Sequence, residues 1–342
     1  MSDNRIHLEA IMIIDWQHHY CPPEILVRRG KKKLEPNTPI YTDQGQVASH
    51  FKPELYDIDT HLKFMDAAGI DKAVLSMAGN ITFEESKIVN DAFAKIMEAH
   101  PDRFIGLASS IPGRGDASLG ELNRAINGLR LKGVSIDYQI EGQTLDSKTL
   151  WPFYERVSEL KVPLFVHIAG TRQGFEGLMS KDFNLWTTLG TMVVDQSATV
   201  RIILSGILTQ FPDLQIVIAH LGGGIAAIKE RFTRYLKMWG KGIWTELGGT
   251  PPFPEPLDKQ FEDHFNRLYF DMAGYEGGMN AVKCALVAID PRKLLFGTDY
   301  PFNFTEIPSA VKEYIQNIRS LDLPQEAIEG MLGGNAAGLL GI

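Results

Sequence analysis

Three apolar segments of the sequence end in a side chain that can bind a metal ion or transfer a proton. Their last residues are His167, His220 and Asp299. Short apolar runs of this kind are typical of buried strands. In a parallel β/α barrel the C-terminal ends of the strands meet at one mouth, and catalytic side chains come from several of them. We therefore expect these three residues to lie in one site.

A fourth polar group, 15–19, follows the first apolar run and has the sequence Asp-Trp-Gln-His-His. Successive side chains of a strand point to opposite faces. This alternation predicts that Asp15, Gln17 and His19 share one face. It also predicts that His18 points the other way and has a structural role.

The rest of the chain alternates between apolar runs and amphipathic helical segments. This alternation predicts a (β/α)8 barrel, and 342 residues with a hydrophobic share of 44% suit one such barrel with insertions. The runner-up is a doubly wound open sheet, which is disfavoured because no glycine-rich phosphate loop follows the first strand. The strands are expected at 10–15, 72–77, 104–109, 133–137, 164–167, 216–220, 268–272 and 294–296.

Residues 22–55 interrupt this alternation with a stretch rich in proline, glycine and charge. The stretch is too long for an ordinary loop between a strand and a helix. We expect an insertion over the barrel mouth, within one domain that covers 1–342, with short strands near 39–42 and 47–51. A second long loop is expected from 169 to about 198.

Composition and charge argue against several functions. The net charge is −8, and the one basic run, 28–33, contains no aromatic residue, so nucleic-acid binding is not expected. No membrane association is expected either, because no segment has the length of a membrane span and the first residues do not resemble a signal peptide. Cys21 and Cys284 lie far apart without a CxxC pattern, which favours a reducing cytoplasm.

The strand-end residues resemble those of the amidohydrolase superfamily. More narrowly, the segments 211–224, 296–302 and 333–337 resemble its decarboxylase-type branch, and the resemblance extends over 11–340. That branch includes aminocarboxymuconate semialdehyde decarboxylase, hydroxybenzoate decarboxylases, and some hydratases and hydrolases.

The resemblance implies one divalent metal ion, held by Gln17, His19, His167 and Asp299. Zinc is the favoured ion and manganese the alternative. The family usually has a His-x-His pair on the first strand, whose second histidine is His19 here and whose first position is Gln17. An amide oxygen is neutral and a harder ligand than imidazole, so this departure favours a harder ion such as manganese, or an empty site.

The resemblance also implies catalytic roles for His220 and Asp299. Asp299 beside the ion would stay ionised and transfer a proton, and His220 would act as a general acid or base. Structural alternatives remain for each residue alone, since a histidine at a strand end is often a hydrogen-bonded core group and an aspartate can cap a helix. The combination of His19, His167, His220 and Asp299 in family order favours the functional interpretation.

The expected reaction is the non-oxidative decarboxylation of a small hydroxylated aromatic or muconate-like carboxylic acid. A hydrolase or hydratase is the alternative, because the same ion could activate water. A metal-free binding protein is a third possibility, supported by Gln17 alone. The resemblance also implies a homodimer. Candidate substrate contacts, each of which could equally be a surface or packing residue, are Arg172 as a carboxylate clamp and Trp186, Tyr300 and Phe302 as pocket walls.

Overall fold

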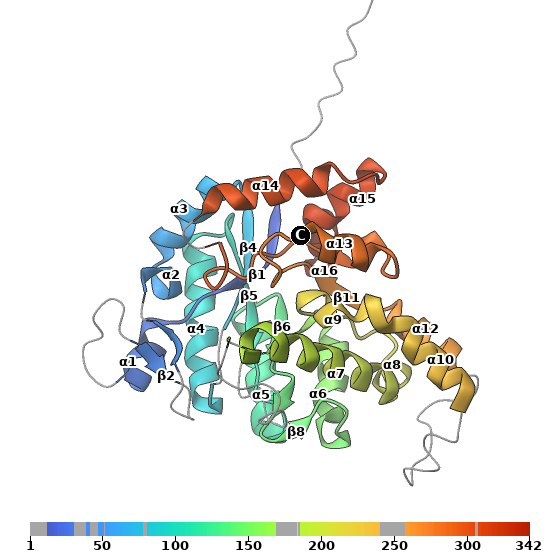
Figure 1. Cartoon of the computed structure of the whole chain (residues 1–342). Helices are drawn as coiled ribbons and strands as arrows, with labels where there is room; N and C mark the ends of the chain where they lie inside the picture. Colours follow the sequence, from blue (N-terminus) through green and yellow to red (C-terminus); the bar gives the residue numbers. More distant parts are fainter. Residues whose placement is uncertain are drawn as a thin grey trace, which may run out of the picture.

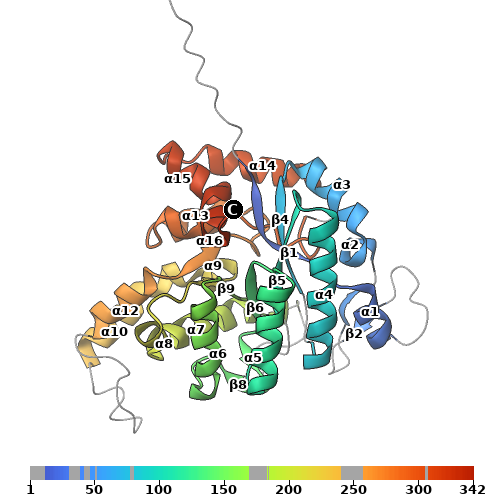
Figure 2. The same ribbon diagram turned by 180° about the vertical axis from the view of Figure 1, so that it is seen from behind.

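A barrel of eight parallel strands forms the centre of the molecule, with helices around it (Figures 1 and 2). The computed structural model describes residues 12–30, 39–41, 47–50, 52–77, 81–168, 183, 185–239, 257–304 and 307–342. The predicted (β/α)8 fold is confirmed. In sheet order the strands are β1 (Ile14–His19), β4 (Lys72–Ser76), β5 (Phe104–Ser109), β6 (Gly133–Ile136), β9 (Leu164–Val166), β10 (Ile216–Ile218), β11 (Tyr269–Asp271) and β12 (Leu294–Leu295).

The segment that follows β12 closes the barrel against β1 through backbone hydrogen bonds. Trp16 N donates to Phe296 O at 2.8 Å, and Asp299 N donates to Gln17 O at 2.9 Å. This closure places the end of the first strand beside the residues that follow the last one.

Most helices follow a strand and cover the outside of the barrel. The main helices are α3 (Ile58–Ala68), α4 (Phe83–Ala99), α5 (Asp116–Asn123), α6 (Trp151–Leu160), α7 (Thr191–Leu204), α10 (Lys229–Trp239), α12 (Leu257–Phe265), α13 (Met279–Leu286), α14 (Pro308–Arg319) and α16 (Asn335–Leu340). Shorter helices are α1 (Pro23–Gly30), α2 (Pro53–Tyr56), α8 (Ile207–Gln210), α9 (His220–Gly224) and α15 (Gln325–Glu329).

Two apolar layers hold the barrel together. Val74 and Phe165 point into the barrel and belong to the inner cluster. Ala73 and Leu75, the neighbours of Val74 on β4, belong to the outer cluster between strands and helices. Leu339 of α16 joins the inner cluster, so that the last helix covers the N-terminal end of the barrel and leaves the C-terminal end for the polar residues.

A β-bulge in β1 changes the predicted orientation of its side chains. Asp15 pairs with Ala73 and His18 with Leu75, so Trp16 and Gln17 together face the single residue Val74. An extra residue of this kind inverts the alternation beyond it. The prediction that Asp15 shares a face with Gln17 and His19 is therefore wrong.

Other predictions fall on the segments between the strands. The short strands β2 (Pro39–Tyr41) and β3 (Val47–His50) are present in the region of the expected insertion. The long loop expected from 169 to about 198 is wrong for its second half, because a π-helix (186–190) and then α7 occupy it. The position of the insertion over the mouth stays a prediction.

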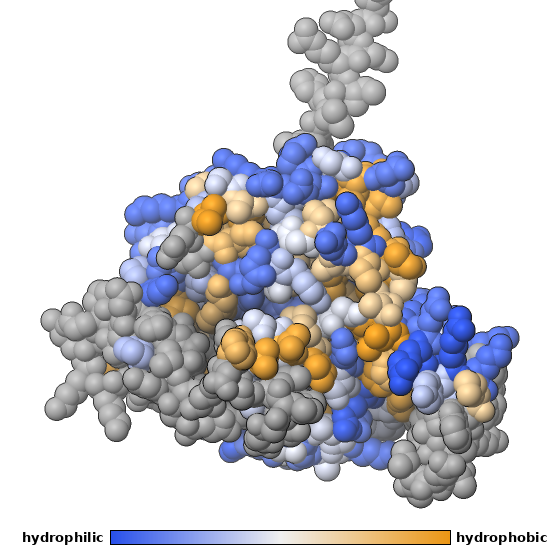
Figure 3. All heavy atoms as spheres, viewed as in Figure 1, coloured by the Kyte–Doolittle hydropathy of each residue, from blue (hydrophilic) through white to orange (hydrophobic). Residues whose placement is uncertain are grey.

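The surface on the side shown in Figure 3 mixes hydrophilic side chains with smaller groups of apolar ones. Large apolar side chains that reach solvent include Leu189, Met238 and Val287. Within the described ranges, no helix has both the length and the apolar composition that crossing a membrane requires. The predicted homodimer stays a prediction.

Candidate metal centre at the barrel mouth

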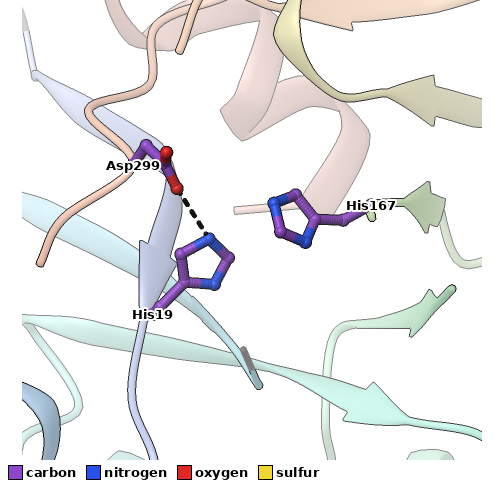
Figure 4. A group of neighbouring side chains, drawn as sticks. All are labelled: His19, His167 and Asp299. Atoms are coloured by element: carbon purple, nitrogen blue, oxygen red, sulfur yellow. Dashed lines mark hydrogen bonds and ion pairs between the residues drawn. The ribbon is translucent and has the colours of Figure 1, made fainter. Parts of the chain in front are cut away.

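Three residues from different strands converge at the C-terminal end of the barrel. His19 ends β1, His167 follows β9 and Asp299 follows β12. Each residue offers one possible ligand atom, and these three atoms all lie within 4.8 Å of one another. His19 Nε2 lies 3.0 Å from Asp299 Oδ1, and the His167 ring faces this pair across the mouth (Figure 4). Two imidazoles and a carboxylate in this arrangement are a suitable donor set for a divalent ion.

Gln17 extends into the same cluster. Its Oε1 is buried and has no hydrogen-bond partner among the described residues. Its amide carries only two hydrogens, so it can satisfy two acceptors at a time. Yet Nε2 of Gln17 lies within 3.4 Å of four side-chain atoms, namely Asp299 Oδ1 (2.8 Å), His220 Nε2 (2.9 Å), His167 Nε2 (3.1 Å) and His19 Nε2 (3.4 Å).

The spacing of these atoms suits a shared ion. Two ligands at a right angle on one ion lie roughly 2.8–3.1 Å apart when each bond is about 2.0–2.2 Å long. The distances from the Gln17 amide lie in or close to this range. The residues at the mouth therefore fit one divalent ion, and their roles as ligands remain a prediction.

Two of the imidazoles in the cluster are oriented by hydrogen bonds to their Nδ1 atoms, which point away from the site. Nδ1 of His19 lies 3.0 Å from Ser76 Oγ, and Nδ1 of His220 lies 2.9 Å from Asp195 Oδ2. A carboxylate on Nδ1 fixes the hydrogen there and turns the Nε2 lone pair towards the site, which is the usual support of a metal-ligating or proton-transferring histidine.

A left-handed backbone turn presents His220. Gly223 is needed in this turn because a Cβ there would lie 1.9 Å from Met192 O of α7. The glycine allows α7 to approach, and α7 carries Asp195 to the His220 ring. The run has positive φ at every residue, with values of 52° at His220, 53° at Leu221, 60° at Gly222, 67° at Gly223 and 78° at Gly224. Strained conformations of non-glycine residues, such as that of His220, are concentrated at functional sites.

The site shifts the pKa values of its acid and base in opposite directions. Burial lowers the pKa of His220, but the carboxylate of Asp195, together with those of Asp299 and Asp271, outweighs burial and the pKa rises to about 9. Burial favours a higher pKa for Asp299, but the hydrogen bond from His19 and the imidazoles of His19 and His220 hold that pKa below its ordinary value. These side chains therefore favour an ionised Asp299 and a proton on His220.

Asp299 is positioned by a polar group on the outer side of β1. Asp15 Oδ1 accepts from Thr298 N at 2.8 Å, and Asp15 Oδ2 accepts from Thr298 Oγ1 at 2.6 Å. His18 Nδ1 lies 2.9 Å from the same Oδ2. These bonds fix the residue before Asp299, whose own backbone is left-handed with φ of 62°.

The predicted substrate contacts differ in their placement. The Phe302 ring lies 5.5 Å from the His19 ring and is 44% exposed, so it borders the cluster. Trp186 is partly buried in the π-helix that precedes α7. Tyr300 is buried and stacks on His18, on the outer side of β1, so its ring does not line the mouth. Arg172 lies outside the described residues.

Two carboxylates near His220 were not among the predicted site residues. Asp195 lies where a loop was expected, although the apolar spacing of Val194, Ala198 and Ile202 could have indicated the helix that carries it. Asp271 Oδ1 accepts from His220 N at 3.0 Å, and burial raises the pKa of Asp271 to about 7. It therefore supports the backbone of His220 from the end of β11.

The fold agrees with a comparison against protein families. The chain belongs to the Amidohydro_2 family of amidohydrolases, whose model matches residues 14–342. Gamma-resorcylate decarboxylase from Rhizobium sp. (strain MTP-10005) is 27% identical over 277 residues, which cover 75% of this chain and 81% of that protein. The 2-keto-4-carboxy-3-hexenedioate hydratase of Sphingobium sp. (strain NBRC 103272 / SYK-6) is 22% identical, with 95% of each chain covered.

Solved structures share the barrel. The crystal structure of 5-carboxyvanillate decarboxylase LigW from Sphingomonas paucimobilis has a TM-score of 0.79 and 23% identity, and the match covers 97% of this chain and 100% of that one. A dihydroxybenzoic acid decarboxylase from Polaromonas sp. JS666, with bound manganese and the inhibitor 2-nitroresorcinol, has a TM-score of 0.71 and 21% identity, with 97% of both chains covered. At these identities the similarity supports the fold.

Proposed function

We propose that this chain is a metal-dependent carboxy-lyase that removes CO2 from a small hydroxylated aromatic or muconate-like carboxylic acid. The observation that carries the proposal is the convergence of His19, His167 and Asp299 at the barrel mouth. The chain's family and the decarboxylases among its relatives support it.

Decarboxylation breaks the bond between the carboxyl carbon and the rest of the substrate. The electron pair stays on the remaining carbon, which must then take up a proton. A divalent ion, when bound, polarises an oxygen of the substrate and so supplies the electron sink. Zinc is the first candidate, and manganese is the alternative, which the manganese-bound relative and the hard amide ligand of Gln17 favour.

His220 is the proposed proton donor. Asp195 holds the hydrogen on Nδ1, so the proton that His220 gives and takes is the one on Nε2, which faces the cluster. The raised pKa of His220 keeps this proton available near neutral pH. Asp299 is the second candidate for proton transfer, and its lowered pKa keeps it ionised as a ligand.

The proposal places Phe302 and Trp186 at the wall of the substrate pocket and Arg172 as the clamp of a substrate carboxylate. Tyr300 is left out of this pocket because its ring packs on the outer side of β1. The proposal also includes a cytoplasmic location and a homodimer. The location is inferred from two cysteines that lie far apart in the sequence without a CxxC pattern, and the dimer from the family resemblance.

A hydratase is the second candidate, and the relative named a hydratase favours it. The distinguishing experiment incubates the metal-loaded protein with a panel of hydroxylated aromatic and unsaturated dicarboxylic acids in ¹⁸O-labelled water. We expect CO2 release without label in the organic product. Turnover that incorporates label and releases no CO2 would reject the decarboxylase and favour the hydratase or a hydrolase.

A further inference from the structure

Within the cluster at the barrel mouth, Gln17 has a side chain with two chemically different ends. The amide nitrogen donates hydrogen bonds and has no lone pair for a cation, whereas Oε1 accepts and can ligate. In the structure Nε2 points into the cluster, and Oε1 is buried with no hydrogen-bond partner in the described part of the chain. This orientation is the opposite of the one that a metal ion needs.

We propose that Gln17 is a two-state latch of the metal centre. With Nε2 inward it holds the metal-free cluster together, and after a half turn of its amide group Oε1 points inward and ligates the divalent ion. This inference rests on the metal-dependent function proposed above. It adds which hydrogen bonds order the site before the ion binds and which atom of Gln17 then ligates the ion.

The metal-free half of the latch follows from the hydrogen bonds. Asp299 brings a buried negative charge to the cluster, and a buried charge needs a donor or a counter-charge. Nε2 of Gln17 supplies one hydrogen to Asp299 Oδ1 at 2.8 Å. The second hydrogen reaches Nε2 of His220 at 2.9 Å when that ring is neutral, or Nε2 of His167 at 3.1 Å when His220 is protonated. One neutral side chain thus connects the carboxylate with an imidazole.

The metal-bound half follows from the shape of the amide. Its nitrogen and oxygen are nearly equal in size and lie in one plane, so a half turn places Oε1 close to the present position of Nε2. That position lies 2.8 Å from Asp299 Oδ1, 3.1 Å from His167 Nε2 and 3.4 Å from His19 Nε2, a spacing that ligands of one ion adopt. A carboxylate could not serve in both states because it has no hydrogens to donate. Gln17 therefore keeps the site ordered before the ion binds, but it binds the ion less tightly than a carboxylate at this position would.

Nuclear magnetic resonance of protein with ¹⁵N-labelled glutamine side chains tests the latch directly. The Gln17 signals are identified by their loss in Gln17→Glu. In chelator we expect them to be shifted from the positions of a solvated amide and to exchange with solvent more slowly than those of Gln316, which is exposed on α14. One equivalent of zinc, which is diamagnetic, should move both Gln17 signals, while those of Gln196, hydrogen-bonded to Gly223 O at 2.8 Å, should stay in place.

Solvated-amide signals for Gln17 in chelator would overturn the metal-free half. Unchanged signals in protein that elemental analysis shows to contain one zinc per chain would overturn the metal-bound half. If the wild type binds neither zinc nor manganese, the proposed metal-dependent function fails together with the metal-bound half, while the spectrum in chelator still decides the metal-free half.

Metal affinities of variants provide a second, independent measurement by calorimetry. Gln17→Glu needs no turn and adds a charged oxygen, so we expect it to bind manganese at least about tenfold more tightly than the wild type. Gln17→His should bind zinc more tightly, since imidazole is the better zinc ligand. Gln17→Leu has neither the amide nitrogen nor the amide oxygen, so it should bind both ions more weakly. Equal affinities across the wild type and all three variants would show that residue 17 does not contact the ion, and would overturn the latch.

Discussion

The first strand of the barrel carries polar residues on both of its faces, and the two groups are built differently. On the outer face, Asp15 accepts from Thr298 N, Thr298 Oγ1 and His18, and the second ring nitrogen of His18 meets His61 Nδ1 at 2.8 Å. Donors and acceptors alternate along this chain of bonds, and burial lowers the pKa of His18 to about 3, so the imidazole is neutral. The outer group is a chain of paired donors and acceptors that runs from Thr298 to His61 Nδ1, and the buried Nε2 of His61 at its far end has no hydrogen-bond partner among the described residues.

On the inner face, the polar atoms are not paired one to one. Three imidazole nitrogens and a carboxylate oxygen surround one amide nitrogen, and the amide oxygen beside it has no hydrogen-bond partner in the described residues. A carboxylate beside several imidazole nitrogens is a set of ligands that a divalent cation can stabilise. The comparison teaches that similar residues on one strand can have different roles: the outer group positions Asp299, and the inner group is the one that we expect to bind an ion.

Asp299→Asn should have the largest effect, because the asparagine can neither transfer the proton nor hold the ion with a charge. We expect the rate of CO2 release to fall at least about 1,000-fold, within the range that a general acid or base contributes. Asp66→Asn is the matched control, since Asp66 is a surface carboxylate paired with Arg103. Turnover within a few-fold of wild type in Asp299→Asn would remove this residue from the chemistry.

His220→Ala should lower turnover by about 100- to 10,000-fold and leave the ion in place, because His19, His167 and Asp299 remain. The checks are the rate of CO2 release and the metal content of the same sample. Loss of the ion in proportion to activity would instead make His220 an essential ligand.

Thr298→Val tests the outer group with a smaller expected effect. The change removes the hydrogen bond from Oγ1 to Asp15 at 2.6 Å and leaves a buried acceptor with one donor fewer. We expect a loss of about 1–3 kcal/mol in stability, followed by thermal unfolding, and a less than about 100-fold loss of metal affinity. Abolished metal binding in a folded Thr298→Val protein would break the distinction between the two groups.

The pH dependence of metal-free stability isolates the pair His220 and Asp195. The pKa of His220 is about 9 in the folded protein and has an ordinary value of 6.5, so its stabilising effect is complete below pH 6.5 and is lost as the pH rises through 9. The unfolding temperature in chelator should therefore fall more steeply over this range in the wild type than in Asp195→Asn. Parallel curves for the two proteins would contradict the interaction.

Sequence patterns predicted the barrel and five members of the cluster because both depend on local features. Apolar runs mark the strands, and the C-terminal ends of parallel strands meet by topology, so His167, His220 and Asp299 could be expected together. His19 and Gln17 were placed correctly relative to each other. The bulge was not predictable, because the order of polar and apolar residues in the first strand does not show that Trp16 and Gln17 face a single residue of the neighbouring strand.

The residues behind the cluster were harder to predict for a different reason. Asp195 acts on His220 across 25 positions, and the contact depends on the close approach of α7 to Gly223. Such an approach is a tertiary feature that no periodicity encodes. The orientation of Tyr300 was missed similarly, because its packing on Phe64 and His18 becomes visible only when the barrel closes.

Elemental analysis of purified protein tests the central claim, that the inner group binds a metal ion and the outer group does not. For protein produced without chelators we predict about one divalent ion per chain, none after His167→Ala, and about one after Thr298→Val. If the wild type contains no metal and takes up neither added zinc nor added manganese, the account of the inner group is wrong.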